Sequence, residues 1–429
     1  MNEPKPSAGT FTLQRRQSGQ ALIYGLVVLI GGLTALMFLF NTSQLTAEKT
    51  RLVNTADAVA YSAGVMHARA LNFDAYTNRA LMANEVMIAQ AVSIASWSKH
   101  VVTHAQNVPP LLCRTYYSRP VLLMLVTYIP VCYLLSLPST EQLVSGVDEA
   151  IQTTAQGTVA LSEAAKEALQ GAQLNMAASF IPARSSVMQQ VADANYVDDG
   201  AVHVDTIPIT DHFLLFDGKP FINAYTGTER GRFKEATVDA VNKDDFVKQR
   251  SWTSANHMPC ILGNKAEFRR RGGTELIGFD EWKAMDTASL HEWRWNLHLF
   301  RLPTCDEEET ALGYGTQAAA QGAPDDSGAR YGNSRSDNPG ASAHATSGDW
   351  KYSGLPTFYD LSDPALKYLA ADAPARLKFS IRLTRAKGQT RTSDGTSAVK
   401  PSGKLDNFEN EAASGVLAAV VAAGPPLEL

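Results

Sequence analysis

The stretch that decides the fold lies near the N-terminus, where residues 21–40 read ALIYGLVVLIGGLTALMFLF. This run carries no charged side chain, and as an α-helix it would extend about 30 Å, the hydrocarbon thickness of a bilayer. Arg15 and Arg16 stand shortly before it, and the positive-inside rule therefore places the N-terminus in the cytoplasm. The sequence predicts a transmembrane anchor with most of the chain exported.

A cleaved secretory signal is the alternative interpretation of this run. The run is longer than the core of an ordinary signal peptide, no small-residue cleavage site closes it, and residues 41–60 continue in a helical pattern. These features favour the anchor. A second uncharged run at residues 121–137 contains Pro130. It is either a second span or a buried or membrane-resting helix, and the sequence leaves this open.

Two long helices are predicted after the anchor. Residues 42–99 are rich in Ala, lack Pro and carry apolar residues at steps of three and four, which predicts a helix continuous with the anchor. Pro138-Ser139-Thr140-Glu141 is typical of a helix start and opens a second amphipathic stretch, which Pro182 ends or bends. The two helices would pair as a hairpin or coiled coil. The apolar row of the first is Leu45, Leu52, Ala56, Val59, Ala63 and Met66.

The periodicity changes after about residue 202. Residues 291–299 and 377–384 alternate between apolar and polar side chains, which predicts half-buried strands. Residues 314–348 are rich in Gly, Ala, Ser and Asp and are predicted to form a long exposed loop. The predicted fold class is α+β: a transmembrane helix continues into a long helical stalk or hairpin, and a mixed β-rich exported domain follows.

The predicted domain boundaries follow these changes of pattern. They are a cytoplasmic leader over 1–20, a transmembrane helix over 21–40, a helical stalk over 41–108, an apolar hairpin region and long amphipathic helix over 109–200, an α/β-rich exported domain over 201–310, a flexible Gly/Ala/Ser-rich loop over 311–350, and further strands with a C-terminal tail over 351–429.

Charge and cysteine content exclude some functions. The chain has 43 acidic and 38 basic residues, a formal net charge of -5, and lacks the basic excess of a nucleic-acid-binding protein. None of its four cysteines forms a CxxC pair, so neither a zinc site nor a thioredoxin-like site is supported. We expect a disulfide between Cys260 and Cys305, since both lie in the later, strand-rich part; four buried free thiols are the alternative.

No catalytic motif occurs in the sequence: GxSxG, HExxH, Walker A and GxGxxG are all absent. We therefore expect no enzymatic activity, no cofactor and no metal. His291 and His298 would lie on opposite faces of their strand, so each is expected to be a surface or rim residue. Trp293 and Trp295 would share one face, where core packing is favoured over an exposed binding platform.

Two charged clusters are assigned to solvent. Asp306-Glu307-Glu308-Glu309 could bind a hard cation, but a solvated turn is the favoured interpretation. Arg269-Arg270-Arg271 could meet lipid headgroups or an acidic partner, and a solvated loop is favoured there.

Residues 15–64 resemble the N-terminal region of TadE/TadG-type proteins of the tight-adherence (Tad/Flp) pilus assembly system. Two elements carry the resemblance: RRQSGQA at 15–21, before the apolar span, and KTRLVNTADAVAYSAG at 49–64, after it. The resemblance implies a bacterial inner-membrane protein with a periplasmic body, acting as an assembly or minor pilin-like component. Cleavage after Gly19 stays open, since Tyr24 occupies the position where prepilin processing favours Glu.

Pattern and resemblance together predict a non-enzymatic role in pilus assembly through helix–helix packing. The expected partners are membrane lipid and other pilus-assembly or pilin-like proteins, with no nucleic acid, and homo-oligomerisation stays open. A membrane-tethered periplasmic sensor or ligand-binding module is the alternative. The predicted packing face consists of Gly31, Gly32 and Ala35 in the membrane, and of Leu45, Leu52, Ala56, Val59 and Ala63 beyond it.

Overall fold

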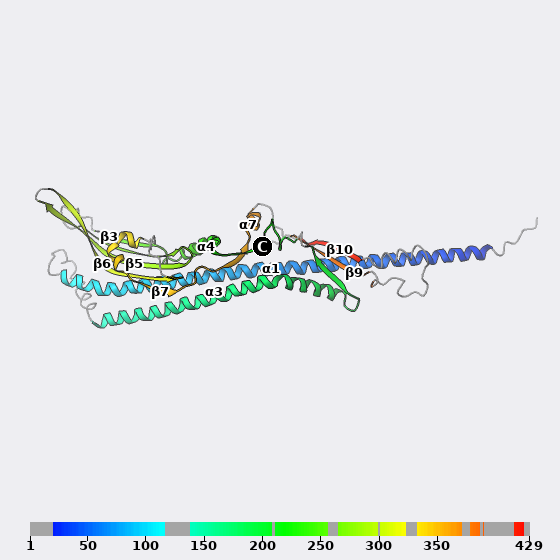
Figure 1. Ribbon diagram of the computed structural model, residues 1–429, viewed down its shortest axis with the longest axis horizontal. Helices are drawn as coiled ribbons and strands as arrows, with labels where there is room; N and C mark the ends of the chain where they lie inside the picture. The colour runs from blue at the N-terminus through cyan, green and yellow to red at the C-terminus, as the bar shows by residue number, and fades with distance from the viewer. Residues whose placement is uncertain are drawn as a thin grey trace, which may run out of the picture. The chain divides into compact units, whose positions relative to one another are not determined.

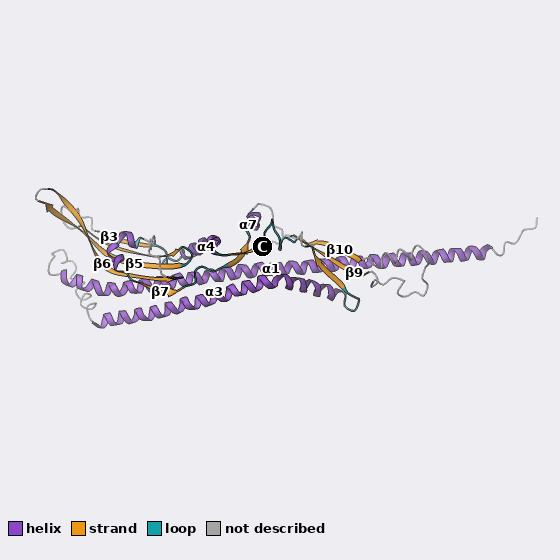
Figure 2. Cartoon of the chain, viewed as in Figure 1, coloured by secondary structure: helices purple, strands orange, loops and turns teal. Residues whose placement is uncertain are grey.

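The computed structural model describes residues 20–115, 138–207, 211–255, 265–298, 301–322, 333–370, 378–386, 389 and 416–423. These residues form two compact units, and each unit contains both helices and strands (Figure 2). The first unit comprises Met1–Ala68, Ile181–Phe221 and Pro364–Leu429; the second comprises Arg69–Phe180 and Ile222–Asp363. Residues 121–137 and most of the leader lie outside the described residues, so the predictions made for them stay predictions.

Helix α1, Gln20–Thr115, contributes residues to both units and confirms the predicted helix that continues from the anchor (Figure 1). Its most apolar stretch has the length and composition to cross a membrane, and none of that stretch is buried. Proline does not end either long helix. α1 continues past Pro109 and Pro110, and α3, Pro138–Asn195, continues past Pro182, because a proline removes a backbone hydrogen bond and can kink a helix without ending it.

The first unit packs α1 and the end of α3 against a three-stranded antiparallel sheet of order β1-β9-β10. Its strands are β1 Val202–Thr206, β9 Phe379–Ala386 and β10 Val416–Ala423, and helix α7, Asp363–Ala370, precedes β9. The strand predicted at 377–384 is thus confirmed. The core of this unit consists of Leu52, Ala56, Val59, Ala60, Ala63, Met188, Ala192, Tyr196, Val202, Phe379, Ile381 and Leu383.

The second unit is built on a five-stranded sheet of order β3-β4-β5-β6-β7, antiparallel except for the parallel pair β6 and β7. A two-stranded sheet, β2 with β8, accompanies it. The strands are β2 Ile222–Tyr225, β3 Arg250–Ala255, β4 Lys265–Ile277, β5 Glu281–His298, β6 Arg301–Ala320, β7 Ser347–Lys351 and β8 Phe358–Leu361. The short helices are η3 Gly227–Arg230, α4 Gly231–Val241, α5 Ser334–Asp337 and α6 Pro339–His344.

Within the second unit, α1 packs against one face of the sheet and α3 runs beside α1 (Figure 1). The shared core includes Ile88 and Val92 of α1, Val159 of α3, and Trp282 of β5. The predicted pairing of the two long helices is therefore confirmed. The strand predicted at 291–299 is also confirmed, since residues 291–298 form the last part of β5.

The loop predicted over 314–348, part of the flexible segment predicted over 311–350, is wrong where the structure describes it. Residues 314–320 belong to β6, and α5, α6 and the start of β7 follow. The small residues permit close packing rather than flexibility. A Cβ on Gly315 would lie 2.2 Å from the Ser96 carbonyl oxygen of α1. Only glycine allows the strand to approach the helix this closely.

Both charged clusters lie in strands, not in solvated turns or loops. Residues 269–271 belong to β4, where Arg271 is buried and its Nε lies 2.6 Å from Asp337 Oδ2. Residues 306–309 belong to β6, where Glu309 accepts hydrogen bonds from Ser289 Oγ at 2.6 Å and from the Gly340 amide at 2.7 Å. Arg271 and Glu309 thus bond to segments that are distant in sequence, which local pattern does not reveal. Arg270, Asp306, Glu307 and Glu308 are exposed, so the expected contact with solvent holds for them.

The aromatic and imidazole predictions on β5 are also corrected. His291, expected at the surface, is 2 % exposed; its ring nitrogens lie 2.8 Å from Glu307 Oε1 and 3.0 Å from Asn338 Oδ1. Trp295, expected in the core, is 40 % exposed, and Trp293 is half-buried beneath the Lys265 ammonium at 4.2 Å. The alternation indicated which residues share a face, but it did not indicate how deeply each of them is buried.

Candidate functional site

One side of α1 presents small, exposed residues. Gly31, Gly32, Ala35, Leu39, Thr42, Ser43, Thr46, Ala47 and Thr50 recur at helical steps of three and four, and all are exposed. Because a helix advances about 100° per residue, this spacing places them on one side of the helix. We call this set the small-residue stripe. Among the described residues, no group beyond the adjacent backbone of α1 lies within 4 Å of where a Cβ on Gly31 or Gly32 would stand.

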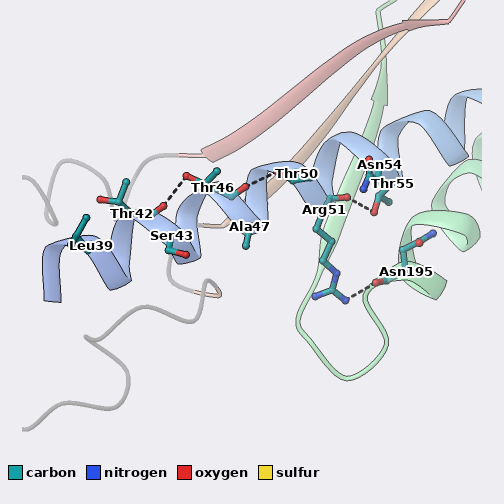
Figure 3. Close-up of a pocket in the computed structure, with 10 residues that line it drawn as sticks. All are labelled: Leu39, Thr42, Ser43, Thr46, Ala47, Thr50, Arg51, Asn54, Thr55 and Asn195. Atoms are coloured by element: carbon teal, nitrogen blue, oxygen red, sulfur yellow. Dashed lines mark hydrogen bonds between the residues drawn. The ribbon is translucent and has the colours of Figure 1, made fainter. Parts of the chain in front are cut away.

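The stripe leads into an open pocket of about 880 Å³ in the first unit, at the end of α3. Figure 3 shows Thr42, Thr46 and Thr50 along α1, with Arg51 reaching toward Asn195, the last residue of α3. The pocket is lined by Leu39, Thr42, Ser43, Thr46, Ala47, Thr50, Arg51, Asn54, Thr55 and Asn195. α3 and β9 pack against another side of α1, since Leu52 stands about 200° around the helix from Gly32.

The threonines of the stripe leave no hydroxyl in need of a partner. Thr42 Oγ1 donates to the Phe38 carbonyl at 2.8 Å. Thr46 donates to the Thr42 carbonyl and Thr50 to the Thr46 carbonyl, at 2.8 and 2.9 Å (Figure 3). Such bonds to the preceding turn satisfy the hydroxyl and turn the methyl group outward. Another helix could therefore cover the stripe without stranding these polar groups.

Arg51 holds the end of α3 against α1. Its Nη2 donates to the Asn195 carbonyl at 2.7 Å, its Nη1 pairs with Asp199, and its guanidinium lies 4.2 Å from the centre of the Tyr196 ring. A cation at the carbonyl end of a helix satisfies free acceptors and interacts favourably with the helix dipole. The position at which α3 stops, and hence the pocket, is fixed by these contacts.

A second arginine completes this cluster from β9. The side chain of Arg385 is fully buried, pairs with Glu48 of α1 and lies 3.4 Å from Asp199 Oδ1. Burial and the nearby Glu48 carboxylate raise the pKa of Tyr196 to about 12, so its phenol stays protonated near neutral pH. The cluster joins α1, the segment after α3 and β9 by charge-assisted contacts.

The structure divides the predicted packing face into two parts. Gly31, Gly32 and Ala35 are exposed, and Leu45 is half-buried. The rest of the row, Leu52, Ala56, Val59 and Ala63, is at most 1 % exposed and lies in the first unit's core with residues of α3 and β9. Its partner is therefore this same chain. The spacing carried no information about which protein covers this row, and docking of the exposed residues against a partner helix stays a prediction.

Sequence reasoning missed a buried cluster that also joins these elements. Arg184 Nη2 of α3 lies 2.5 Å from Asp211 Oδ2, and Arg184 Nη1 lies 2.8 Å from His67 Nε2 of α1. Burial, and then the Arg184 charge, lowers the pKa of His67 to about 4, so the imidazole is neutral at pH 7 and can accept from the guanidinium. The one signal in the sequence is that Arg184, a charged residue, falls on the apolar side of its helix.

The cysteine prediction is tested only at one end. Cys305 is disulfide-bonded, but Cys260 lies outside the described residues, so their pairing stays a prediction. Among the residues that the structure describes, no group of three or more His, Cys, Asp or Glu side chains is arranged to hold a metal ion.

The stripe, the apolar span and Arg51 all fall within one recognisable segment. Residues 19–70 match the family of putative Flp pilus-assembly TadE/G-like proteins. No curated protein and no solved structure matches the chain significantly. The TadE/G-like segment ends near the last turn that α1 contributes to the first unit. It supports a pilus-related role, association with a membrane and interaction with other pilus-assembly proteins.

Proposed function

We propose that this chain is a non-enzymatic, TadG-like pilus-assembly or minor pilin-like component anchored in the bacterial inner membrane. Its N-terminus lies in the cytoplasm and its body in the periplasm. The observation that carries the proposal is the TadE/G-like match at residues 19–70, which coincides with an apolar, entirely exposed stretch of α1. The basic residues before that stretch support the orientation.

The chain acts by presenting the small-residue stripe to a membrane helix of another pilus-assembly protein. In lipid the hydrophobic effect does not drive helices together, so association depends on close packing at small residues. Gly31, Gly32 and Ala35 offer that closeness within the membrane, and the back-bonded threonines continue it beyond. The occupant would lie along the exposed side of α1, which is separate from the side that packs against α3 and β9.

Gly32→Leu tests this mechanism. The added side chain would hold a docked helix away from α1, and the loss of about 1–2 kcal/mol of packing corresponds to roughly five- to thirtyfold weaker association. The readout is the amount of pilus-assembly proteins that co-purifies from detergent-solubilised membranes of the source bacterium, together with pilus formation.

Thr34→Leu is the matched control. It lies two residues further on, at similar depth, and so about 200° around the helix from Gly32. The proposal predicts loss for Gly32→Leu and wild-type co-purification for Thr34→Leu. Equal behaviour of both variants contradicts the stripe as the docking face. Loss of self-association alone, measured with two differently tagged copies, would identify a second copy of this chain as the occupant instead.

Reporter fusions test the orientation separately. A periplasm-active reporter after residue 200 should be active if the body is exported. Cytoplasmic activity there, with periplasmic activity after residue 110, would show that residues 121–137 cross the membrane again and would contradict a periplasmic body.

A further inference from the structure

The second unit contains a pocket that the pilus-related role does not use. It has a volume of about 520 Å³ and opens between α1 and strands β3, β4 and β5. This size falls within the range of about 300–1,000 Å³ typical of small-ligand sites. The lining residues are Trp97, His100, Val101, His104, Trp252, Phe268, Arg270 and Ala288.

Aromatic side chains form much of the wall. The Trp252 and Phe268 rings meet edge to face with centroids 5.6 Å apart, and the Phe268 and His104 rings do so at 6.4 Å. Trp252 is 56 % exposed. An exposed indole beside a phenyl ring offers a flat apolar surface on which a ligand ring gains contact area.

Two imidazoles on α1 line the same pocket. His100 and His104 are one helical turn apart, with ring centroids 5.7 Å from each other. The Nδ1 atom of each is buried and has no hydrogen-bond partner among the described residues, although His100 is only 3 % exposed. His100 Nδ1 faces β6, where a Cβ on Gly313 would lie 2.7 Å from it. Burial and then the Arg270 charge lower the pKa of both rings, that of His100 to about 3.

The charge of the pocket is positive. Arg270 is exposed at the lining, and no carboxylate among the described residues pairs with it. The buried Asp286, on whose carboxylate the Arg270 charge acts, is bound by Arg250 Nη2 at 2.6 Å and by Ser96 Oγ at 2.9 Å. A guanidinium that forms no salt bridge among the described residues, beside aromatic walls, favours an anion that carries a flat apolar body.

We propose that this pocket binds a small aromatic carboxylate. The carboxylate pairs with the Arg270 guanidinium, and the ring lies against Trp252 and Phe268. The neutral rings of His100 and His104 complete the wall of the pocket. The proposal stands independently of the pilus-related role.

The experiment titrates the full-length chain in detergent with 2-naphthoate, following heat and tryptophan fluorescence. Saturable 1:1 binding is expected, with a fluorescence change from Trp97 and Trp252. Arg270→Gln should weaken binding roughly ten- to hundredfold, the effect of losing a hydrogen bond to a charged group. Arg270→Lys should retain part of the affinity. Arg294→Gln, an exposed arginine of β5 that does not line the pocket, should leave it unchanged.

Ligand controls separate charge from ring. The neutral 2-naphthamide should bind at least about tenfold more weakly than 2-naphthoate, and inorganic phosphate should not compete. Absence of saturable binding, equal affinity of Arg270→Gln and wild type, or displacement by inorganic phosphate would each overturn the proposal. Circular dichroism establishes that each variant is folded, and Arg270→Gln, at an exposed position, is expected to fold normally.

Discussion

Replacing Leu52 by alanine tests whether the buried row of α1 belongs to this chain's own core. Leu52 is 1 % exposed and clusters with Met188 of α3 and Ile381 of β9. Leucine-to-alanine changes at such positions cost about 2–5 kcal/mol, because a cavity remains in addition to the lost burial. We expect the upper half of that range. The row's neighbours Ala56 and Val59 are short and held on a helix, so they cannot fill the space.

Hydrogen exchange measured by mass spectrometry on the full-length chain reads this loss locally, which matters because two units need not unfold together. A cost of about 3–5 kcal/mol corresponds to exchange roughly a hundredfold to several thousandfold faster around residues 47–60, at conditions where opening is in equilibrium. Leu161→Ala is the control: it makes the same change on α3 at a residue that is 74 % exposed, and should alter exchange less than about threefold.

The opposite result would refute the reasoning. If Leu52→Ala leaves exchange around residues 47–60 unchanged but abolishes co-purification of pilus-assembly proteins, the row meets another protein and is not part of this chain's core. Faster exchange with normal co-purification is the result expected from the structure.

Three further predictions concern the second unit. Burial and a neighbouring carboxylate raise the pKa of Asp74 from 3.8 to about 7. Because the pKa is higher in the folded than in the unfolded chain, stability falls as pH rises from about 4 to about 7. Asp74→Asn should therefore raise Tm at pH 8 but hardly at pH 4. Lys166→Met should cost about 3–5 kcal/mol in urea unfolding, because it leaves Glu85, 2.6 Å from Lys166 Nζ, buried without its counter-ion; adding Glu85→Gln should restore part of this, and no restoration would contradict the pairing. Gly315→Ala should lower the free energy of unfolding by about 1–3 kcal/mol, because the added Cβ would meet the Ser96 carbonyl. The measurement is the midpoint of urea unfolding, and an unchanged midpoint would contradict the close approach.

Periodicity predicted the helices and strands that bury one side and expose the other. The step of three and four from Leu45 to Ala63 gave α1, and the alternation at 291–299 and 377–384 gave parts of β5 and β9. These patterns reflect burial of one side, which the sequence states directly. The family pattern around Arg51 also located the segment to which the candidate docking face belongs.

What sequence could not supply is the identity of the group opposite each residue. The spacing placed Leu52 on a packing face, but only the fold shows that α3 and β9 cover it. Gly315 suggested flexibility, whereas a helix occupies the space its side chain would need. Lys166 and Glu85 are far apart in sequence, and neither has a local signal of its partner. Long-range proximity decided each of these cases.

Site-specific photocrosslinking in living cells can show whether the small-residue stripe is the face that docks to another protein. A photoreactive amino acid at Leu39, on the small-residue stripe, is compared with one at Met37, which is also exposed but about 200° around the helix. If the small-residue stripe is the docking face, Leu39 should crosslink to a membrane-anchored pilus-assembly protein, and Met37 should crosslink to it at least about tenfold less. Equal crosslinking from both positions, or crosslinking from Met37 alone, would contradict the stripe as the docking face.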